Sequence, residues 1–176
     1  MNYAGIKKMD VANGPGLRVT LFVSGCTHHC KGCFNKETWD FKYGEPFTEE
    51  TEKLLLDYLK PDYIAGFTLL GGEPFERVNQ EALTPFLKKV RETYPEKTIW
   101  CFTGYDFEKD IKGRMIGQWE HTEEMLSYID ILVDGEFKEE LKNLNLRFKG
   151  SSNQRTIKVK ESLEQGKIVF WEGSND

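Results

Sequence analysis

Three cysteines lie close together in the segment SGCTHHCKGCFN, where Cys26, Cys30 and Cys33 are separated by three and by two residues. Three thiolates can hold three irons of an iron–sulfur cluster and leave one iron open for chemistry. Structural zinc sites and electron-transfer clusters usually have four protein ligands instead. The spacing therefore favours a reactive cluster, with a zinc site, a group of buried thiols or a disulfide as the alternatives.

Two histidines and the remaining cysteine are the candidates for a fourth ligand. His28 and His29 lie between two of the clustered cysteines, although a solvated histidine is the commoner finding in a loop. Cys101 lies within the apolar segment IWCF, a position that favours an inert buried thiol over a metal ligand. A zinc site completed by one of these three side chains is kept as an alternative.

A second motif, LLGGEP at residues 69–74, follows an apolar segment typical of a strand. Gly71 and Gly72 would let the backbone approach a ligand closely because glycine has no Cβ, and a Cβ at Gly72 is expected to enter the space of that ligand. Glu73 would add an acceptor for an amino group. A plain turn without a ligand is the alternative, since Gly-Gly is common in turns.

The composition is typical of an enzyme-sized intracellular domain. No linker or repeat divides the 176 residues, so residues 1–176 are expected to form a single domain with a sizeable core. A net charge of -5 disfavours a general nucleic-acid or anionic-membrane surface. We find no signal peptide and no membrane-spanning segment, and therefore expect a cytoplasmic protein. Thiols stay reduced in that compartment, so clustered cysteines favour a metal over a disulfide.

The elements that must position these motifs alternate along the chain. Four segments have the apolar, β-branched pattern of strands: 17–24, 67–70, 98–102 and 129–133. Helices are expected between them, from Thr48, from about residue 79 and from beyond residue 104 to about residue 128. Thr48 is the expected N-cap of the first helix, with Thr51 at its third position. The buried face of that helix is expected to carry Leu54, Leu55, Tyr58 and Leu59.

This alternation predicts a parallel sheet with helices outside it and ligands at the carboxyl ends of its strands. A complete barrel usually takes about 250 residues, so this α/β chain is expected to form an incomplete, laterally open (β/α) barrel. A polar segment, 143–155, precedes two short strands expected at 156–159 and 168–171. Little sequence is then left to cover the pocket, which favours a protein loop over a metabolite as the substrate.

The cysteine loop after the first strand and the Gly-Gly-Glu motif after the second together resemble the radical S-adenosylmethionine enzymes. The resemblance implies an open barrel of that type, in which Cys26, Cys30 and Cys33 hold a [4Fe-4S] cluster and S-adenosylmethionine chelates the open iron. The Gly-Gly-Glu motif would receive the methionine part of this cofactor. One electron would then split it into methionine and a 5'-deoxyadenosyl radical, which abstracts a hydrogen atom.

Further segments narrow the resemblance to the activating enzymes that generate glycyl radicals, beginning with NGPGLR at residues 13–18. Four others are similar to the activating proteins of anaerobic ribonucleotide reductases: 26–39, 103–105, 133–135 and 150–154. The resemblance covers about residues 2–158. It implies an enzyme whose partners are an anaerobic ribonucleoside-triphosphate reductase, as the protein substrate, and an electron donor such as flavodoxin or a reductase.

The same resemblance implies contacts to the rest of the cofactor. Pyruvate formate-lyase activases normally carry an aromatic residue just before the third cysteine, where this chain has Gly32. The adenine would therefore contact the backbone of Gly32 and Cys33 and stack on Phe34. Thr103 and Asp134 would reach the carboxylate or the ribose, with a helix cap or a turn as the alternative role.

The resemblance also leaves alternatives for the remaining motif and for the function. Asn13 and Arg18 would face the glycine-bearing loop of the partner, with a turn residue and a surface charge as the alternatives. Two other hypotheses remain beside the reductase activase. One is an activase of another glycyl radical enzyme, of the pyruvate formate-lyase type, and the other is a non-catalytic zinc or iron–sulfur binding module.

Overall fold

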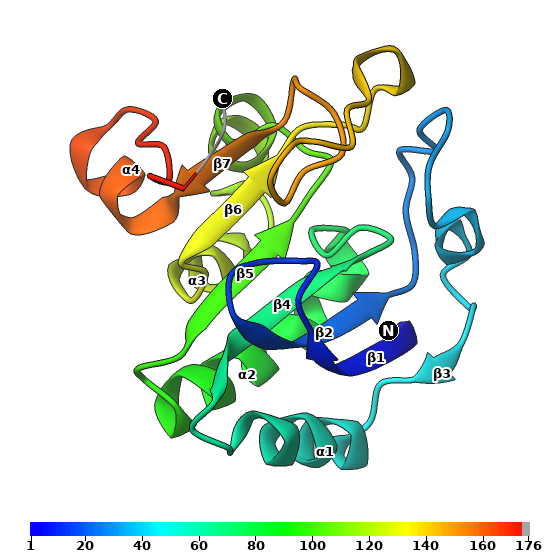
Figure 1. Cartoon of the computed structure of the whole chain (residues 1–176), viewed down its shortest axis with the longest axis vertical. Coiled ribbons are helices and arrows are strands. Elements are labelled where there is room, and N and C mark those ends of the chain that lie inside the picture. The colour runs from blue at the N-terminus through cyan, green and yellow to red at the C-terminus, as the bar shows by residue number, and fades with distance from the viewer. Residues whose placement is uncertain (174–176) are drawn as a thin grey trace.

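Four parallel strands form the centre of a seven-stranded sheet, and antiparallel strands extend it on both sides (Figure 1). The computed structural model describes residues 1–173. The strands, in chain order, are β1 (Asn2–Asp10), β2 (Leu17–Val23), β3 (Glu45–Pro46), β4 (Ile64–Gly71), β5 (Thr98–Phe102), β6 (Ile131–Asp134) and β7 (Arg155–Lys158). Their spatial order is β3-β1-β2-β4-β5-β6-β7. In the described part of the chain the two outer strands do not pair, so the sheet is not closed.

Helices connect the parallel strands. The α-helices are α1 (Glu49–Leu59), α2 (Arg77–Thr93), α3 (Thr122–Ser127) and α4 (Val159–Gln165). A π-helix, η2 (Phe107–Met115), precedes α3, and two short 3-10 helices are η1 (Lys36–Trp39) and η3 (Glu139–Leu141). The alternation expected from the sequence is therefore confirmed from β2 to β6, although the third expected helix is divided into η2 and α3.

The first helix begins as predicted, but its buried face is narrower. Thr48 is the N-cap, and it exchanges backbone and side-chain hydrogen bonds with Thr51. Leu55 and Leu59 are fully buried one helical turn apart. Leu54 is 40% exposed, so its predicted burial is wrong. One residue corresponds to about 100° around a helix, which places Leu54 beside the apolar stripe rather than within it.

The two faces of the sheet have different neighbours because successive side chains of a strand point to opposite faces. Leu21, Phe67 and Leu69 belong to the main core, which the helices cover. Trp100 belongs to a smaller hydrophobic cluster on the other face. The ring of Trp171 packs against Trp100, with ring centroids 4.9 Å apart. Figure 1 shows the connection between β1 and β2 crossing that second face, in front of β4 and β5.

Arg18 lies buried on this second face. Its Nε donates to Oγ1 of Thr68 at 2.8 Å, and its Nη2 donates to the carbonyl oxygens of Thr98 at 2.8 Å and Phe67 at 3.1 Å. Burial lowers the pKa of Arg18 to about 10. Both expectations for Arg18, a surface charge and a contact with the partner, are wrong because the guanidinium is 0% exposed and links β2 to β4 and β5.

Asn13 has a structural role in the connection between β1 and β2. Its Nδ2 donates to Oδ2 of Asp10 at 2.7 Å, and Oγ1 of Thr20 donates to the same oxygen at 2.7 Å. The carbonyl oxygen of Asn13 accepts a 2.9 Å hydrogen bond from Oγ1 of Thr68. These contacts support the alternative of a turn residue for Asn13.

The two ends of the chain differ from the sequence prediction. β1 and β3 were not predicted, and they extend the sheet beyond β2. The strand expected at 156–159 is β7, but Val159 begins α4 instead. Residues 168–171, expected to form a strand, contribute only a single bridge between Phe170 and Ile157. Within residues 1–173, no helix is both long and apolar enough to cross a membrane.

Candidate functional site

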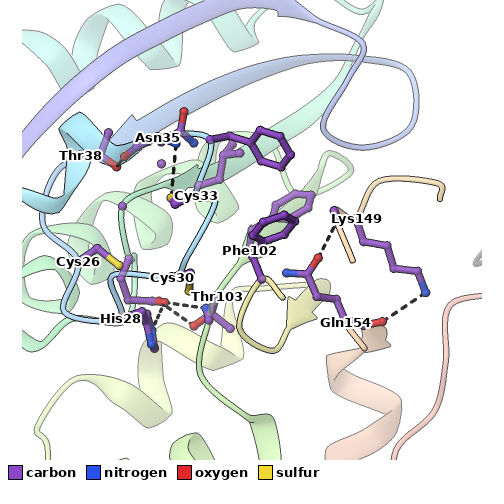
Figure 2. A pocket seen from close by; sticks show the side chains of 18 of the residues that line it. Cys26, His28, Cys30, Cys33, Asn35, Thr38, Phe102, Thr103, Lys149 and Gln154 are labelled. Carbon is purple, nitrogen blue, oxygen red and sulfur yellow. Dashed lines mark hydrogen bonds and ion pairs between the residues drawn. The ribbon is translucent and has the colours of Figure 1, made fainter. Parts of the chain in front are cut away.

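The sequence motifs meet in one cavity of about 360 Å³ at the carboxyl ends of the parallel strands. The predicted site residues that line it are Cys26, Cys30, Cys33, Phe34, Gly71, Gly72, Glu73 and Thr103. Figure 2 shows the three cysteines on one side of this cavity and Lys149 and Gln154 on the other. The structure therefore brings together the cysteine loop and the Gly-Gly-Glu motif, as the order of strands predicted.

Backbone hydrogen bonds fix the start of the cysteine loop. The N–H of Gly25 donates to the carbonyl of Thr38 at 2.7 Å, and the N–H of Cys26 donates to the carbonyl of Trp39 at 3.3 Å. A Cβ built on Gly72 would lie 2.6 Å from the oxygen of Gly25 and 2.8 Å from that of Thr38. The expectation that this Cβ would enter ligand space is therefore wrong. Glycine is needed there because three backbone segments meet.

The three clustered thiols differ in their surroundings. Cys26 is 8% exposed, and burial raises its pKa to about 12. The pKa of Cys30 is also raised, mainly by burial and to a smaller extent by the negative charge of Glu136. The Sγ of Cys33 accepts a 3.4 Å hydrogen bond from the N–H of Asn35. All three are free thiols. Since the thiolates of Cys26 and Cys30 are costly here, a cationic metal centre would have to stabilise their deprotonated forms.

Glu73 is 1% exposed and forms the centre of a hydrogen-bond network. Its Oε1 accepts from Nε2 of His28 at 2.8 Å and from the N–H of Gly104 at 2.7 Å. Its Oε2 accepts from the N–H of Phe75 at 2.9 Å and from Oγ1 of Thr103 at 2.7 Å. A carboxylate has about four acceptor positions, and these four donors fill them. An amino group of a ligand must therefore displace a donor or bind a neighbouring carbonyl.

The two histidines of the cysteine loop have different environments. The side chain of His28 is 8% exposed, and its Nδ1 lies 3.0 Å from Oε1 of Glu136. Burial opposes protonation of His28, but the hydrogen bonds and charges of Glu73 and Glu136 outweigh it and raise the pKa to about 9. The expectation of a solvated histidine is wrong for His28. His29 is exposed and stacks on Trp39, with ring centroids 4.3 Å apart.

A second buried carboxylate, Glu76, binds the same loop from the start of α2. Its Oε1 accepts from the N–H of Thr27 at 3.3 Å, from Oγ1 of Thr27 at 2.8 Å and from the hydroxyl of Tyr105 at 3.0 Å. Because Thr103 and Gly104 bind Glu73, the segment 103–105 supports both glutamates. The sequence analysis assigns only one contact to this segment, from Thr103 to the cofactor. The structure shows that all three of its residues hold the two glutamates in place.

Residues 135–154 form the wall opposite the cysteines. The Nδ2 of Asn153 donates to the carbonyl of Glu136 at 2.8 Å, and Nε2 of Gln154 donates to the carbonyl of Gly135 at 3.0 Å. Oε1 of Gln154 accepts from the N–H of Gly150 at 2.8 Å. The expectation that little sequence remains to cover the pocket is wrong, because seven residues of this segment line it: Gly135, Phe137, Leu146, Phe148, Lys149, Gly150 and Gln154.

Of the described residues, two predicted cofactor contacts are not in the cavity wall. The Oδ2 of Asp134 accepts from Nη2 of Arg155 at 2.6 Å and from the N–H of Phe107 at 2.8 Å, at the start of η2. Asp134 is 1% exposed, so the structure favours its alternative role as a cap. Gly32 has a φ of +76°, and a Cβ there would lie 3.0 Å from the side chain of Glu139.

Comparison with known proteins identifies the family. Residues 12–157 match a family model described as a 4Fe-4S single cluster domain. Three curated relatives are named anaerobic ribonucleoside-triphosphate reductase-activating protein. The relative from Enterobacteria phage T4 is 44% identical over 155 residues, which cover 88% of this chain and 92% of the relative. This chain belongs to that family of activating proteins.

The other two relatives come from bacteria. The relative from Pasteurella multocida strain Pm70 is 42% identical over 156 residues, covering 88% of this chain and 95% of the relative. The relative from Escherichia coli strain K12 is 38% identical over 156 residues, covering 88% and 96%. The similarity thus extends over nearly the full length of these relatives.

The iron–sulfur domain of the family fits the donor set of the cavity. Within residues 1–173, no three His, Cys, Asp or Glu side chains converge to hold a single metal ion. In an iron–sulfur cluster each thiolate binds a different iron. Three thiols on one wall of the cavity therefore fit a cluster although they do not converge on a single metal position. Cys101 is 0% exposed, belongs to the main core and has a pKa that burial raises well above the usual value. Its predicted burial is confirmed.

The sequence analysis assigned no role to three residues that organise the site: Glu76, Glu136 and Tyr105, the last of which lies in the segment 103–105 singled out by resemblance. The only signal for Glu76 was its position three residues after Glu73 in GGEPFE. Glu136 gave no signal, because its partner His28 lies 108 positions away in the chain.

Proposed function

We propose that this chain reductively cleaves S-adenosylmethionine at a [4Fe-4S] cluster held by Cys26, Cys30 and Cys33, and uses the resulting radical to form a glycyl radical on anaerobic ribonucleoside-triphosphate reductase. One observation carries the proposal. Three thiols and the Gly71–Gly72 backbone line a single cavity, in a chain whose relatives are named activating proteins. We assign this chemistry to a single domain of the laterally open (β/α)-barrel type.

The proposed chemistry needs one electron from an external donor, such as flavodoxin or a reductase. Cys26, Cys30 and Cys33 would hold the [4Fe-4S] cluster, which would supply the electron that cleaves S-adenosylmethionine into methionine and a 5'-deoxyadenosyl radical. This radical takes a hydrogen atom from the Cα of a glycine in the reductase. The products are 5'-deoxyadenosine and a glycyl radical on the reductase.

The residues of the cavity have separate proposed roles in binding the cofactor. Gly71 and Gly72 bring the backbone against the methionine part, where a Cβ would meet the backbone of β2 at Gly71 and that of Gly25 and Thr38 at Gly72. Phe34 is 60% exposed at the cavity wall, and its ring offers a face for the adenine. The backbone of Gly32 and Cys33 lies directly before that ring. Thr103 orients Glu73 through a 2.7 Å hydrogen bond.

The environment of the candidate fourth ligands favours a cluster over a structural zinc site. A zinc site usually needs four ligands around one ion. His28 is engaged by Glu73 and Glu136, His29 stacks on Trp39, and Cys101 is buried in the core. These positions support a centre with three thiolate ligands.

The experiment that tests the proposal is electron paramagnetic resonance of the reductase after anaerobic incubation with this protein, a reductant and S-adenosylmethionine. We expect a glycyl radical signal that disappears when the target glycine of the reductase is changed to alanine. Metal analysis should give about four irons and four sulfides per chain. One zinc per chain, or no radical from a protein with a full cluster, would contradict the proposal.

A further inference from the structure

Three of the loops that line the cavity are far apart in the sequence, and His28, which belongs to one of them, contacts the other two. It belongs to the cysteine loop, its Nε2 binds Glu73 in the connection from β4 to α2 at 2.8 Å, and its Nδ1 binds Glu136 in the segment 135–154 at 3.0 Å. The ring also lies edge-on against Tyr105, with centroids 4.4 Å apart. Figure 2 shows His28 at the base of the site, beside Cys30 and Thr103.

The position of the imidazole is fixed by its neighbours. A Cβ on Gly104 would lie 2.8 Å from Cδ2 and Nε2 of His28, so the ring packs directly against that backbone. Both ring nitrogens lie within hydrogen-bond distance of a carboxylate oxygen, Nε2 at 2.8 Å from Glu73 and Nδ1 at 3.0 Å from Glu136. A ring flip would place carbon atoms against both carboxylates and break both hydrogen bonds. One side chain thus holds two acidic residues from two different loops.

The cysteine loop has other anchors that do not involve His28. Thr27 binds Glu76 through its N–H and its hydroxyl, and the N–H groups of Gly25 and Cys26 bind carbonyls of residues 38 and 39. Removal of the imidazole should therefore leave the cysteine loop folded. Its specific effect should fall on the orientation of Glu73 and on the link to the segment 135–154.

We propose that His28 is a positioning residue, which holds Glu73 and the wall formed by residues 135–154 in place around the S-adenosylmethionine pocket. The proposal rests on the proposed function, because it assigns the pocket to that ligand. Without the imidazole, Oε1 of Glu73 keeps only the hydrogen bond from Gly104. The wall loses one of its contacts with the cysteine loop, while those of Phe137 with Phe34 and of Glu139 with Lys31 remain. Ligand binding must then order both elements, which weakens it.

Three substitutions of His28 separate its two hydrogen bonds, and His29 provides a matched control. The amide nitrogen of glutamine in His28→Gln takes the place of Nε2 and reaches Glu73, whereas that of asparagine in His28→Asn takes the place of Nδ1 and reaches Glu136. His28→Ala removes both contacts. His29→Ala changes the neighbouring exposed ring, which stacks on Trp39.

The first measurement is the affinity of each cluster-loaded variant for S-adenosylmethionine. The change in the electron paramagnetic resonance spectrum of the reduced cluster on addition of S-adenosylmethionine reports the binding. We expect full iron and sulfide content in all four variants. The dissociation constant should rise about tenfold in His28→Ala, from the loss of a charge-assisted hydrogen bond. His28→Gln, which keeps the contact with the buried Glu73, should restore more of the affinity than His28→Asn, which keeps only the contact with the exposed Glu136. His29→Ala should bind as the unchanged protein does.

The second measurement is amide hydrogen exchange of the chain without cluster or cofactor. His28→Ala should accelerate exchange in residues 135–154, and His29→Ala should not. Unchanged exchange and unchanged affinity in His28→Ala would overturn the proposal. Loss of iron in His28→Ala equal to that in Cys30→Ala would also overturn it, because the imidazole would then serve the loop itself. Failure of the unchanged holoprotein to bind S-adenosylmethionine would instead refute the proposed function, and the exchange measurement alone would decide the role of His28.

Discussion

Nε of Arg18 and Oγ1 of Thr68 lie 2.8 Å apart in the interior, between the sheet and the connection from β1 to β2. The Thr68 hydroxyl donates onward to the carbonyl of Asn13 at 2.9 Å. Two strands and a loop are therefore joined by a buried chain of polar groups. Such a chain stabilises the fold only while each of its members has a partner.

Arg18→Leu should lower the free energy of unfolding by about 3 kcal/mol or more, because several buried acceptors lose their donor at once. Urea unfolding followed by circular dichroism measures the change. Lys53→Met, at an exposed position of α1, serves as the control and should stay within about 0.5 kcal/mol of the unchanged protein. Equal stability of Arg18→Leu and the control would contradict the role assigned to the guanidinium.

The stability contributed by Asp10 should depend on pH. Burial tends to raise the pKa of Asp10, but hydrogen bonds from Ala12, Asn13 and Thr20 and the charge of Lys7 outweigh it, so the net effect is a lowered pKa. A carboxyl group with a lowered pKa in the folded state stabilises the fold above its unfolded pKa of about 3.9. This contribution is lost as the pH falls through the folded-state pKa.

Asp10→Asn should therefore lower the free energy of unfolding by about 1–2 kcal/mol at pH 7. The difference from the unchanged protein should shrink as the pH falls from about 5 to about 2, because the carboxyl group becomes protonated. Urea unfolding at a series of pH values tests this. A difference that stays constant over the whole range would show that the ionised form of Asp10 has no role.

Gly72→Ala should reduce the amount of iron and sulfide that the chain binds. The added Cβ meets the backbone oxygens of Gly25 and Thr38 and displaces the start of the cysteine loop. Gly5→Ala is the matched control, because a Cβ on Gly5 meets nothing within 4 Å. The measurement is iron and sulfide content after reconstitution. Full content in Gly72→Ala would mean that the loop can shift without losing its cluster.

Replacement of each cysteine in turn should distinguish the cluster ligands from Cys101, which lies in the core. Alanine at position 26, 30 or 33 should abolish the cluster and the cleavage of S-adenosylmethionine. Cys101→Ser should keep the iron but lower the free energy of unfolding by about 1–3 kcal/mol, because a hydroxyl is buried in the apolar core. Absorption spectra and metal analysis distinguish the two results. Iron loss in Cys101→Ser equal to that in Cys30→Ala would assign Cys101 to the metal centre.

The central strands could be predicted from the sequence because local pattern and final environment agree there. β2 and β5 are apolar, β-branched segments that end at recognisable motifs. β1 could not be predicted because its sequence, NYAGIKKMD, includes a glycine and two adjacent lysines and lacks the pattern of a strand. Its strand conformation is stabilised by pairing with β2. Thr48 was predictable for the same local reason, since a capping box needs only residues three positions apart.

The network behind the cysteines could not be predicted, because its partners are distant in the chain. Glu73 stood out through its neighbours Gly71 and Gly72, yet its hydrogen bonds come from the cysteine loop and from the end of β5. Arg18 was expected at the surface because a charged residue usually lies there. Its burial becomes favourable only when carbonyls of β4 and β5 lie beside it.

The two walls of the cavity are made at different times during synthesis of the protein. The cysteine loop leaves the ribosome early, whereas residues 135–154 follow only after β6, and β7 then pairs with β6. Until that last part has emerged, the cysteine loop lacks the opposite wall and the contact between His28 and Glu136. We therefore expect iron–sulfur insertion to be efficient only after residue 154 has joined the fold.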